Sequence, residues 1–575
     1  MPPHKHGGDL VADTLDHHNV KWIFTLCGGH ISPILTGCNK IGIRVIDVRH
    51  ESTAVFAADA VSRLSNGIGV AVVTAGPGLT NTITAIKNAQ MAQIPILILG
   101  GATATVLKGR GSLQDIDHIK LIRSIIKRSF TIKKVKDIQQ TLHKSILMAR
   151  SDVPGPVFVE LPIDILYPEY LVRKWYGLKS NSRSMPGWLA WYLNWNVNRI
   201  FKKSHRSYYK KNKNKLVAST SIYFSRISEF LSNAQKPILL IGSQAMVNVE
   251  KIYLLVEALK KIGIPCYVSG MARGLLSNAD LTIFRHARSK ALKESDFILL
   301  AGVPCDFRLD YGRQINHKAK IISINRSKQD LYLNRKPTIG ILGDSCQFLI
   351  DFSKIFNKKK NVNWEKNLLI MDKKRKDEIL SMADKKSDFI NPLQICLAIN
   401  KHIKDGDIIV ADGGDFVATA SYILQPRSLT GWLDPGIFGT LGVGAGFIIG
   451  SQLTHPKSII WAIFGDGAFG YSLIEFDTFV RHNIPVIAII GNDSGWNQIA
   501  RDQIDIFKDP ISTELKPTQY HKAVEALGCV GLIIENETEI EPMLSKSIEL
   551  AKSGKSVLIN VKIGKTNFRK GSISM

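Results

Sequence analysis

This 575-residue sequence lacks paired cysteines, long apolar runs and a recognisable signal peptide. Its seven cysteines are scattered and form no Cys-x-x-Cys pair. We therefore expect reduced thiols in a cytosol-facing compartment, and neither a disulfide framework nor a zinc site. No run reaches the roughly 18–20 apolar residues that a membrane-spanning helix needs. The opening, MPPHKHGGDLVADTLDHH, shows no apolar core of a signal peptide.

Acidic residues are also scarce, with 49 Asp and Glu against 75 Lys and Arg and a net charge of +26. A basic balance favours nucleic acid, a membrane surface or an anionic substrate as partner, and it also arises from lysines at solvated positions. No RNA-recognition, zinc-finger or other nucleic-acid module is recognisable, so we expect no nucleic-acid partner.

Two nucleotide-binding motifs are incomplete. Each Gly-Lys-Ser/Thr triplet lacks the leading glycine of a phosphate-binding loop, because Glu549 and Ile559 occupy that position. The stretch GVGAGF (442–447) has Phe447 in place of the third glycine of a dinucleotide fingerprint. Both motif-based nucleotide sites are therefore excluded.

What the sequence does contain is a repeated alternation of helical patterns with short apolar runs such as GVAVVTA, KPILLIGS and IPVIAIIGND. This alternation predicts an α/β fold of three doubly wound parallel-sheet domains. We expect domains over 1–175, 218–352 and 391–575, an aromatic and basic linker over 176–217, and a Lys-rich helical connector over 353–390.

The linker has two parts of different composition. In PGWLAWYLNWNVNRIF (186–201) the aromatic residues Trp188, Trp191, Tyr192 and Trp195 recur at helical spacing. The following segment, 202–215, has seven Lys or Arg and no acid. This order is typical of a helix lying in a membrane surface. A helix packed on the protein itself, followed by a solvated linker, is the alternative.

The motif with the clearest chemistry is a βαβ unit with a carboxylate after each of its strands. Asp466 follows the run Ile459 to Phe464, and Asp493, 27 positions later, follows Val486 to Ile490. Adjacent parallel strands end at the same edge of a sheet, where α/β proteins bind ligands. Oxygen ligands beside a glycine turn suit Mg²⁺ or Ca²⁺ held together with a phosphate group.

These residues lead to a resemblance. A Gly-Asp-Gly turn followed about two dozen residues later by an Asn-Asn variant is similar to the signature of thiamine diphosphate-dependent enzymes. The blocks TLCGGHISPI, TAGPGLTNTITAIKNAQMAQIPIL, WLDPGIFGTLGVGAGF and GDGAFGYSLIEFDTFVRH resemble the acetolactate synthase-like branch of that family. The resemblance extends from HGGDLVADTL to FRKGSISM. It implies a pyrimidine-binding N-terminal domain, a central domain, and a C-terminal domain that binds diphosphate and Mg²⁺.

The resemblance assigns roles in the C-terminal domain. Asp466 would be a metal ligand through its carboxylate, Asp493 or Asn492 the second ligand, and Gly495 a ligand through its carbonyl. Asp493 replaces the asparagine of the family, which places an extra negative charge beside the diphosphate. The remaining cofactor-binding positions implied there are Gly414, Asp415, Phe416, Gly439, Leu441, Gly465, Gly467, Ala468 and again Asn492 and Gly495.

In the N-terminal domain the resemblance makes Glu51 the residue that hydrogen-bonds the aminopyrimidine ring and promotes proton removal from the cofactor. Gln114 would face the reacting carbon, and His30 would shuttle protons. Gly76 and Asn81, in TAGPGLTN, would lie along the pyrimidine end of the cofactor. Without the other motifs, Glu51 would be interpreted as the carboxylate of a helix N-terminus. A surface position is the alternative for His30 and for Gln114.

Assembly, cofactors and location also follow from the resemblance. Glu51 and Asp466 would meet across a subunit interface, which implies a homodimer or homotetramer. The central domain would bind FAD, an adenine nucleotide or nothing. Relatives in this branch carry an N-terminal membrane anchor, so we expect a cytosol-facing protein at the endoplasmic reticulum membrane, or a soluble cytoplasmic one if the anchor is absent.

The expected reaction is that of a lyase in fatty-acid α-oxidation and lipid metabolism. It would cleave the C1–C2 bond of a 2-hydroxyacyl-CoA and release a shortened fatty aldehyde and formyl-CoA. The first alternative is condensation of 2-ketoacids by an acetolactate synthase; the stretch GWNQIARDQIDIF departs from the segment that shapes the pocket of those enzymes. The second alternative is a non-catalytic scaffold, which would be expected to lack Glu51 or the Gly-Asp-Gly turn.

Overall fold

The structure is a computed structural model that describes residues 6–178, 185–202, 220–356 and 362–570. The chain divides into two compact units, unit 1 within residues 1–214 together with 445–450, and unit 2 within 215–444 together with 451–575. Each unit is built on parallel sheets with helices between successive strands.

Unit 1 contains one six-stranded parallel sheet. In spatial order its strands are β2 (Arg44–Asp47), β1 (Trp22–Thr25), β3 (Gly69–Val73), β4 (Ile96–Ala102), β6 (Val157–Pro162) and β5 (Arg128–Thr131). Its helices are α1 (Gly7–His17), α2 (Ser32–Lys40), α3 (Glu51–Leu64), α4 (Pro77–Thr80), α5 (Ile83–Met91), α6 (His118–Ile122), α7 (Ile138–Arg150), α8 (Ile163–Leu166), α9 (Glu169–Trp175) and α10 (Gly187–Phe201).

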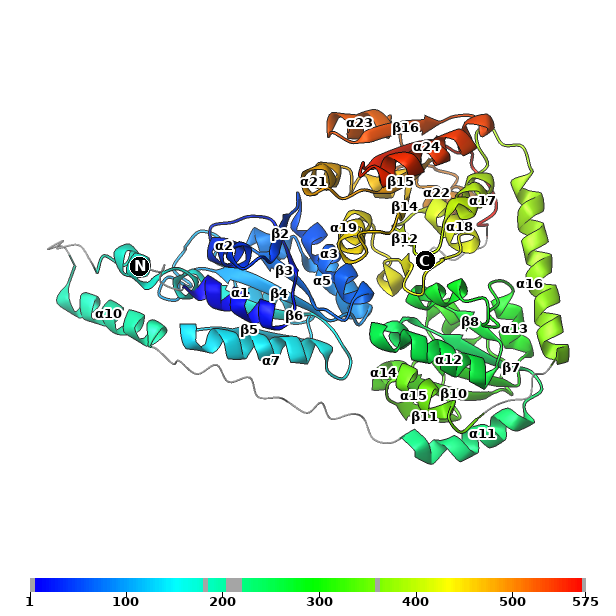
Figure 1. The fold of residues 1–575 in the computed structure, drawn as a ribbon, viewed down its shortest axis with the longest axis horizontal. Coiled ribbons are helices and arrows are strands. Elements are labelled where there is room, and N and C mark those ends of the chain that lie inside the picture. The colour runs from blue at the N-terminus through cyan, green and yellow to red at the C-terminus, as the bar shows by residue number, and fades with distance from the viewer. Residues whose placement is uncertain (1–5, 179–184, 203–219, 357–361, 571–575) are drawn as a thin grey trace. The chain divides into compact units, whose positions relative to one another are not determined.

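Helices cover both faces of this sheet. Apolar residues of α1, α2 and α7 form one core with alternate strand residues, while α3 packs on the strands together with α5 (Figure 1). Burial on both faces explains why β3 and β4 are continuous apolar runs without polar alternation.

Unit 2 contains two further parallel sheets. The five-stranded central sheet has the order β11 (Ile339–Leu342), β10 (Lys320–Asn325), β9 (Phe297–Ala301), β7 (Pro237–Ile241) and β8 (Cys266–Val268). Its helices are α11 (Phe224–Asn233), α12 (Ile252–Ile262), α13 (Arg288–Glu294), α14 (Lys328–Leu331) and α15 (Ser345–Phe352). The long helix α16 (Val362–Ala383) occupies much of the stretch expected to be a helical connector.

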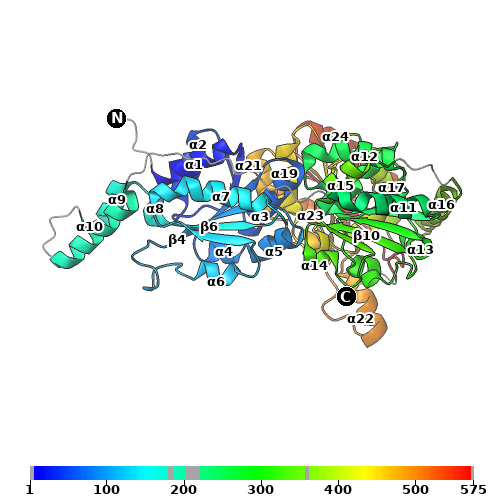
Figure 2. The ribbon, with the colours of Figure 1, turned by 90° about the horizontal axis from the view of Figure 1, so that it is seen from below.

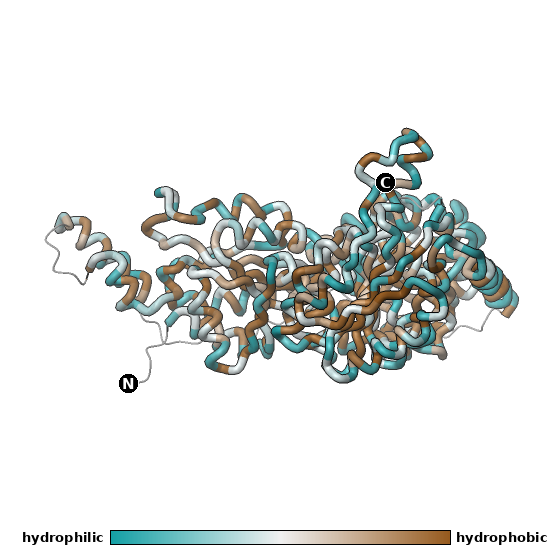
Figure 3. The backbone as a smooth tube through the Cα atoms, turned by 90° about the horizontal axis from the view of Figure 1, so that it is seen from above, coloured by the Kyte–Doolittle hydropathy of each residue, from teal (hydrophilic) through white to brown (hydrophobic). Residues whose placement is uncertain are grey.

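The six-stranded C-terminal sheet has the order β13 (Trp432–Leu433), β12 (Ile408–Ala411), β14 (Ile460–Gly465), β15 (Ile487–Asn492), β17 (Val557–Lys562) and β16 (Val530–Ile534). Its helices are α17 (Pro392–His402), α18 (Asp415–Ile423), α20 (Asp466–Phe469), α21 (Glu475–His482), α22 (Asn497–Phe507), α23 (Tyr520–Ala526) and α24 (Ile540–Lys552). Helix α19 (Gly444–Thr454) also lies in this part of the sequence, but its residues 445–450 belong to unit 1, where Gly446 and Gly450 pack on α3. The hydropathy colouring of Figure 3 shows apolar, brown stretches in the interior and hydrophilic, teal stretches over many outer turns. The predicted fold class, α/β with three parallel sheets, is confirmed.

The aromatic part of the predicted linker is helical. Helix α10 lies alongside α9, beyond the strands of unit 1 (Figure 2). It buries Leu193, Asn196, Val197 and Ile200, whereas the aromatic stripe faces outward. The exposed fractions of that stripe are 72% for Trp188, 68% for Trp191, 42% for Tyr192 and 48% for Trp195.

The basic residues 203–215 of the predicted linker lie outside the described residues. In the part of the chain that is described, every helix is too short or too polar to cross a bilayer.

Candidate active site

The edge of the C-terminal sheet brings Asp466 and Asp493 together. Strands β14 and β15 are adjacent and parallel, with Gly465 paired to Gly491. Asp466 follows the last residue of β14 and Asp493 the last residue of β15. Both carboxylates therefore belong to the carboxyl edge of one sheet, as their spacing in the sequence predicts.

Asp466 is held by backbone amides. It is 2% exposed, and its carboxylate accepts hydrogen bonds from Gly467 N (2.9 Å) and Gly495 N (3.2 Å). Burial raises its pKa to about 6, although these bonds act in the opposite direction. The backbone amides of Gly467 and Gly495 thus orient the Asp466 carboxylate without supplying a positive charge to balance it.

Asp493 and Asp415 add to the negative charge at this edge. Burial, together with the charges of Asp466 and Asp415, raises the pKa of Asp493 to about 7. Asp415, the first residue of α18, has one oxygen paired to Arg501 at 2.8 Å and its other oxygen, Oδ1, buried without a hydrogen-bond partner. Three carboxylates therefore interact electrostatically, and Arg501 and Lys565 balance their charge only in part.

Asn492 is differently engaged. Its side-chain NH₂ group donates to Thr518 O and to Asn560 Oδ1, both at 3.1 Å, and its Oδ1 accepts from Ser494 N at 3.3 Å. These bonds direct the amide toward β17, the neighbouring strand. Only Asp493 of the two candidate second ligands interacts electrostatically with Asp466.

Glycines allow two backbone segments to approach each other closely beside Asp466. Gly465 N donates to Gly413 O at 3.1 Å. Gly414 has a φ of +109°, and a Cβ added there would lie 3.3 Å from Gly465 Cα. Two backbones therefore cross closely at Gly413–Gly414 and Gly465, an arrangement that exposes peptide groups to an anionic ligand.

The loop before α19 is tied to the same edge through Asp412. This buried carboxylate accepts from Gly442 N (2.9 Å) and Gly444 N (2.8 Å), and burial raises its pKa to about 7. Leu441 packs against Gly413, where an added Cβ would lie 2.3 Å from Leu441 Cδ2. Gly439, with a φ of +64°, has open space where a Cβ would be.

The donor set fits a hard divalent cation. Ionised carboxylates and carbonyl oxygens are the ligands that Mg²⁺ prefers. In the described residues, no three His, Cys, Asp or Glu side chains are gathered as a complete metal site. A cation here would therefore need ligands from a phosphate group, a backbone carbonyl or water besides the protein carboxylates.

In unit 1, Glu51 is paired with Asn81. Glu51 is the first residue of α3 and is 5% exposed. Asn81 Nδ2 donates to Glu51 Oε2 at 2.9 Å. His50 caps the helix by accepting from Ser52 N, so the helix N-terminus does not depend on Glu51 for its cap.

Gly76 and Gln114 also lie together. Gly76 has a φ of +61°, and a Cβ added there would lie 2.9 Å from Gln114 Cβ. Gln114 itself has a φ of +62°, a conformation that non-glycine residues seldom adopt. Such a backbone persists only where its surroundings impose it, which is a feature of binding loops.

His30 lies near the same turn. Its Nδ1 is 3.3 Å from Thr74 Oγ1, and its side chain packs on Gly101 of β4. Burial lowers its pKa, and the nearby His118 lowers it further. A neutral imidazole at this position is able to accept a proton.

Sequence reasoning missed three buried polar residues beside these sites. They are Asp412, His118 and Glu160, which are 2%, 2% and 0% exposed. Asp412 lies in ADGGDF, so its position next to a glycine pair was a usable signal. His118 and Glu160 pair across 42 residues, and no local pattern reveals such a contact.

Three family models match in the order expected for one enzyme family. They are "Thiamine pyrophosphate enzyme, N-terminal TPP binding domain" over residues 5–121, the central domain over 224–351, and "C-terminal TPP binding domain" over 412–561. The chain therefore belongs to the thiamine pyrophosphate (thiamine diphosphate) enzyme family. The resemblance inferred from the motifs is confirmed.

The chain is also similar to individual proteins over nearly its full length. The chain is 46% identical to "2-hydroxyacyl-CoA lyase 2" of Danio rerio over 99% of this chain and 94% of that protein. It is 44% identical to the human protein of the same name, over 99% and 92% of the two chains. A "Probable acetolactate synthase" of Mycobacterium bovis is 30% identical over 97% and 95%.

Proposed function

We propose that this chain is a thiamine diphosphate-dependent carbon–carbon lyase. It cleaves the C1–C2 bond of a 2-hydroxyacyl-CoA to give an aldehyde one carbon shorter and formyl-CoA. The observation that carries the proposal is the near-full-length similarity to proteins named 2-hydroxyacyl-CoA lyase 2, at 44–46% identity, in a chain that retains both Glu51 and Asp466.

The residues of unit 1 are suited to proton transfer. When bound, thiamine diphosphate supplies a carbon nucleophile and an electron sink for cleavage beside a carbonyl group. Asn81 already donates a hydrogen bond to Oε2 of Glu51. We therefore assign the other oxygen of Glu51, Oε1, to the hydrogen bond with the aminopyrimidine ring. Gln114, which packs on Gly76, would orient the reacting carbonyl, and His30 would carry protons.

The carboxyl edge of the C-terminal sheet would hold the diphosphate through Mg²⁺. We assign Asp466, Asp493 and the Gly495 carbonyl as ligands, and give Asn492 a structural role because its amide is bonded toward β17. Gly414, Asp415, Phe416, Gly465, Gly467 and Ala468 would surround the diphosphate, with Gly439 and Leu441 on the adjoining loop. A divalent cation would offset the repulsion among Asp415, Asp466 and Asp493.

The alternatives are less well supported. Acetolactate synthases are 30% identical to the chain, against 44–46% for the lyases. A scaffold without activity would not need Glu51 or the Gly-Asp-Gly turn, and both are retained.

A product assay tests the proposal. The purified chain is incubated with Mg²⁺, thiamine diphosphate and either a 2-hydroxyacyl-CoA or pyruvate, and products are identified by mass spectrometry. We expect shortened aldehyde from the first substrate. Acetolactate from pyruvate with no aldehyde from the acyl-CoA would support the synthase instead, and no product from either would support the scaffold.

We propose that a cavity lined by residues of the central domain, α16 and α18 binds an adenine-containing cofactor such as FAD or an adenine nucleotide. It measures about 640 Å³ and is lined by the arginines Arg273, Arg285 and Arg288. Three buried polar atoms on its lining residues lack a hydrogen-bond partner: Tyr267 Oη, His286 Nδ1 and Gln314 Oε1. Aromatic, cationic and unpaired polar groups together match a planar, phosphorylated ligand.

Flavin absorbance of the purified protein and calorimetric titration with ADP test this cavity. Arg288→Met should weaken a bound ligand about tenfold or more, because a charged hydrogen bond is lost. Lys318→Met, outside the lining, is the control. Failure of the wild-type protein to bind either compound would contradict the assignment.

The exposed aromatic stripe of α10 supports a peripheral contact with an anionic membrane surface. Tryptophan and tyrosine prefer the membrane interface, and the chain continues after α10 into a segment with seven Lys or Arg and no acid within 202–215. Such a contact would hold the lyase near long acyl chains, at the endoplasmic reticulum or another cytosol-facing membrane.

Vesicle sedimentation tests this contact. Wild-type protein should sediment with phosphatidylserine-containing vesicles, and Trp188→Ala with Trp191→Ala should abolish that binding. Tyr253→Ala, an equally exposed aromatic residue on α12, should have no effect. Unchanged binding of the tryptophan variant would contradict the role of α10.

A homodimer or homotetramer is the assembly that fits the proposed activity, with Glu51 and Asp466 of each site supplied by different chains. Mixing the inactive variants Glu51→Gln and Asp466→Asn after dissociation and reassembly would then restore about a quarter of wild-type activity, since half of random dimers are hybrids with one intact site. No recovery in mixed dimers would place both residues of a site on one chain.

A further inference from the structure

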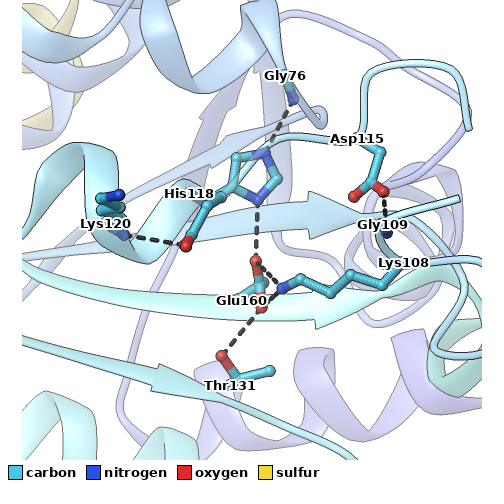
Figure 4. Close-up of polar contacts among 9 residues, drawn as sticks. Gly76, Lys108, Gly109, Asp115, His118, Lys120, Thr131 and Glu160 are labelled. Carbon is cyan, nitrogen blue, oxygen red and sulfur yellow. Dashed lines mark hydrogen bonds and ion pairs between the residues drawn. The ribbon is translucent and has the colours of Figure 1, made fainter. Parts of the chain in front are cut away.

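A carboxylate is buried inside the sheet of unit 1. Glu160 lies on β6, between β4 and β5, and is fully buried. Its oxygens contact His118 Nδ1 at 3.0 Å, Lys108 Nζ at 3.1 Å and Thr131 Oγ1 at 2.9 Å (Figure 4). Burial raises the pKa of Glu160, but these hydrogen bonds and the charge of Lys108 outweigh it and lower the pKa to about 2. The carboxylate is therefore ionised.

The contacts of His118 define its tautomer. Gly76 N donates to His118 Nε2 at 3.0 Å, so Nε2 carries a lone pair. The ring proton of the neutral imidazole is then on Nδ1, where it is donated to Glu160. The ring is 2% exposed, so both bonds are shielded from water.

This pair holds two segments that carry predicted site residues. The first is the turn at Gly76, which leads through α4 to Asn81 and thus to Glu51. The second is the loop after β4, which contains Gln114 and is attached to Glu160 at Lys108 and at His118 (Figure 4). Gly76 and Gln114 touch each other, so the two segments share one anchor.

We propose that His118, oriented by Glu160, is a positioning residue that sets the Gly76 turn and the Gln114 loop for the reaction. The inference rests on the proposed thiamine diphosphate chemistry but not on the acyl-CoA substrate. His118 does not touch the reacting atoms in this assignment. Its role is to fix the backbone that carries Gln114 and, through Asn81, the orientation of the Glu51 carboxylate.

Two substitutions at one position test the role. Glutamine has an oxygen that accepts from Gly76 N and an NH₂ group that donates to Glu160, whereas leucine fills space and offers neither. The readout is deuterium exchange at C2 of thiamine diphosphate bound to the full-length protein with Mg²⁺, followed by proton NMR. This readout needs no acyl-CoA.

We expect His118→Leu to slow the exchange about tenfold or more, because small displacements of positioned groups are costly. His118→Gln should stay within about threefold of the wild-type rate, since both hydrogen bonds are retained. Wild-type exchange in a folded His118→Leu protein would overturn the inference. So would equal slowing in both variants with equal thermal stability.

Lys108 and Thr131 provide a second pair if His118→Leu does not fold. Each donates to Glu160, but Lys108 belongs to the Gln114 loop and Thr131 to the neighbouring strand β5. Lys108→Met should slow exchange and Thr131→Val should not; the reverse would overturn the inference. Absence of exchange in the wild-type protein would instead refute the proposed function, and this inference with it.

Discussion

The two regions that carry the candidate site are stabilised in opposite ways. In unit 1, Glu51 and Glu160 are buried, and their oxygens accept hydrogen bonds from side chains. At the carboxyl edge of the C-terminal sheet, Asp466 and Asp493 are drawn toward the protonated state, with pKa values of about 6 and 7. Unit 1 therefore organises its polar groups by itself, whereas the C-terminal edge concentrates negative charge that Arg501 offsets only in part and that an added cation would offset further.

The difference separates two kinds of function. A group that transfers protons benefits from a fixed orientation, which hydrogen bonds within the protein supply. A group that binds a metal must stay available, so Asp466 and Asp493 lack a cationic side chain as hydrogen-bond partner among the described residues, and burial of their charges costs stability. The following substitutions should affect the two regions differently.

The largest effect is expected from Glu51→Gln, which removes the proton-transferring carboxylate but keeps an amide oxygen facing Asn81. We expect kcat to fall about a thousandfold, within the usual range for general acid–base groups, while Mg²⁺ affinity is unchanged. Steady-state kinetics and calorimetry measure the two. Glu169→Gln, an exposed residue of α9, is the control. A wild-type kcat in the Glu51→Gln variant would contradict the proton-transfer role assigned to Glu51.

Substitutions at the acidic edge should show the reverse pattern. Asp466→Asn and Asp493→Asn should each weaken Mg²⁺ binding about tenfold or more, because a charged ligand is lost. Asn492→Ala should lower thermal stability through its lost bonds to Thr518 and Asn560, and should leave Mg²⁺ affinity nearly intact. Greater sensitivity of Mg²⁺ binding to Asn492→Ala than to Asp493→Asn would make Asn492 the ligand.

Mg²⁺ binding should also depend on pH. The pKa values of Asp466 and Asp493 are raised to about 6 and 7, so a cation competes with protons below neutral pH. Calorimetry should show an affinity that rises about tenfold or more from pH 5.5 to 8.

The same pKa shifts have a consequence for stability without metal. A raised carboxyl pKa means that the folded state binds more protons than the unfolded state between about pH 4 and 7. The Tm should therefore decrease as pH rises through this window, and Mg²⁺ with thiamine diphosphate should reduce the decrease. A Tm that rises through the window in both Asp466→Asn and wild-type protein would show that these groups do not control it.

The smallest effect is expected from Gly76→Ala. The positive φ and the contact with Gln114 predict a loss of about 1–3 kcal/mol in unfolding free energy. Chemical denaturation measures this loss. Gly109→Ala has a similar φ but open space at the Cβ, and separates backbone strain from the clash with Gln114. Equal losses in both variants would mean that the Gln114 contact contributes little.

The sequence was most informative where function depends on strand ends. The spacing of Asp466 and Asp493 located one sheet edge, because parallel strands of a βαβ unit align their carboxyl ends. It did not decide between Asn492 and Asp493, since successive residues at a strand end point in opposite directions. It also missed His118 with Glu160, whose pairing depends on packing between distant segments.

The most direct test of the central claim uses a 2-hydroxyacyl-CoA labelled with ¹³C at C1. With Mg²⁺ and thiamine diphosphate, the account predicts that the label leaves as formyl-CoA or its hydrolysis product formate, while the shortened aldehyde is unlabelled. Label retained in an intact acyl chain, or aldehyde formed equally well without thiamine diphosphate, would contradict it.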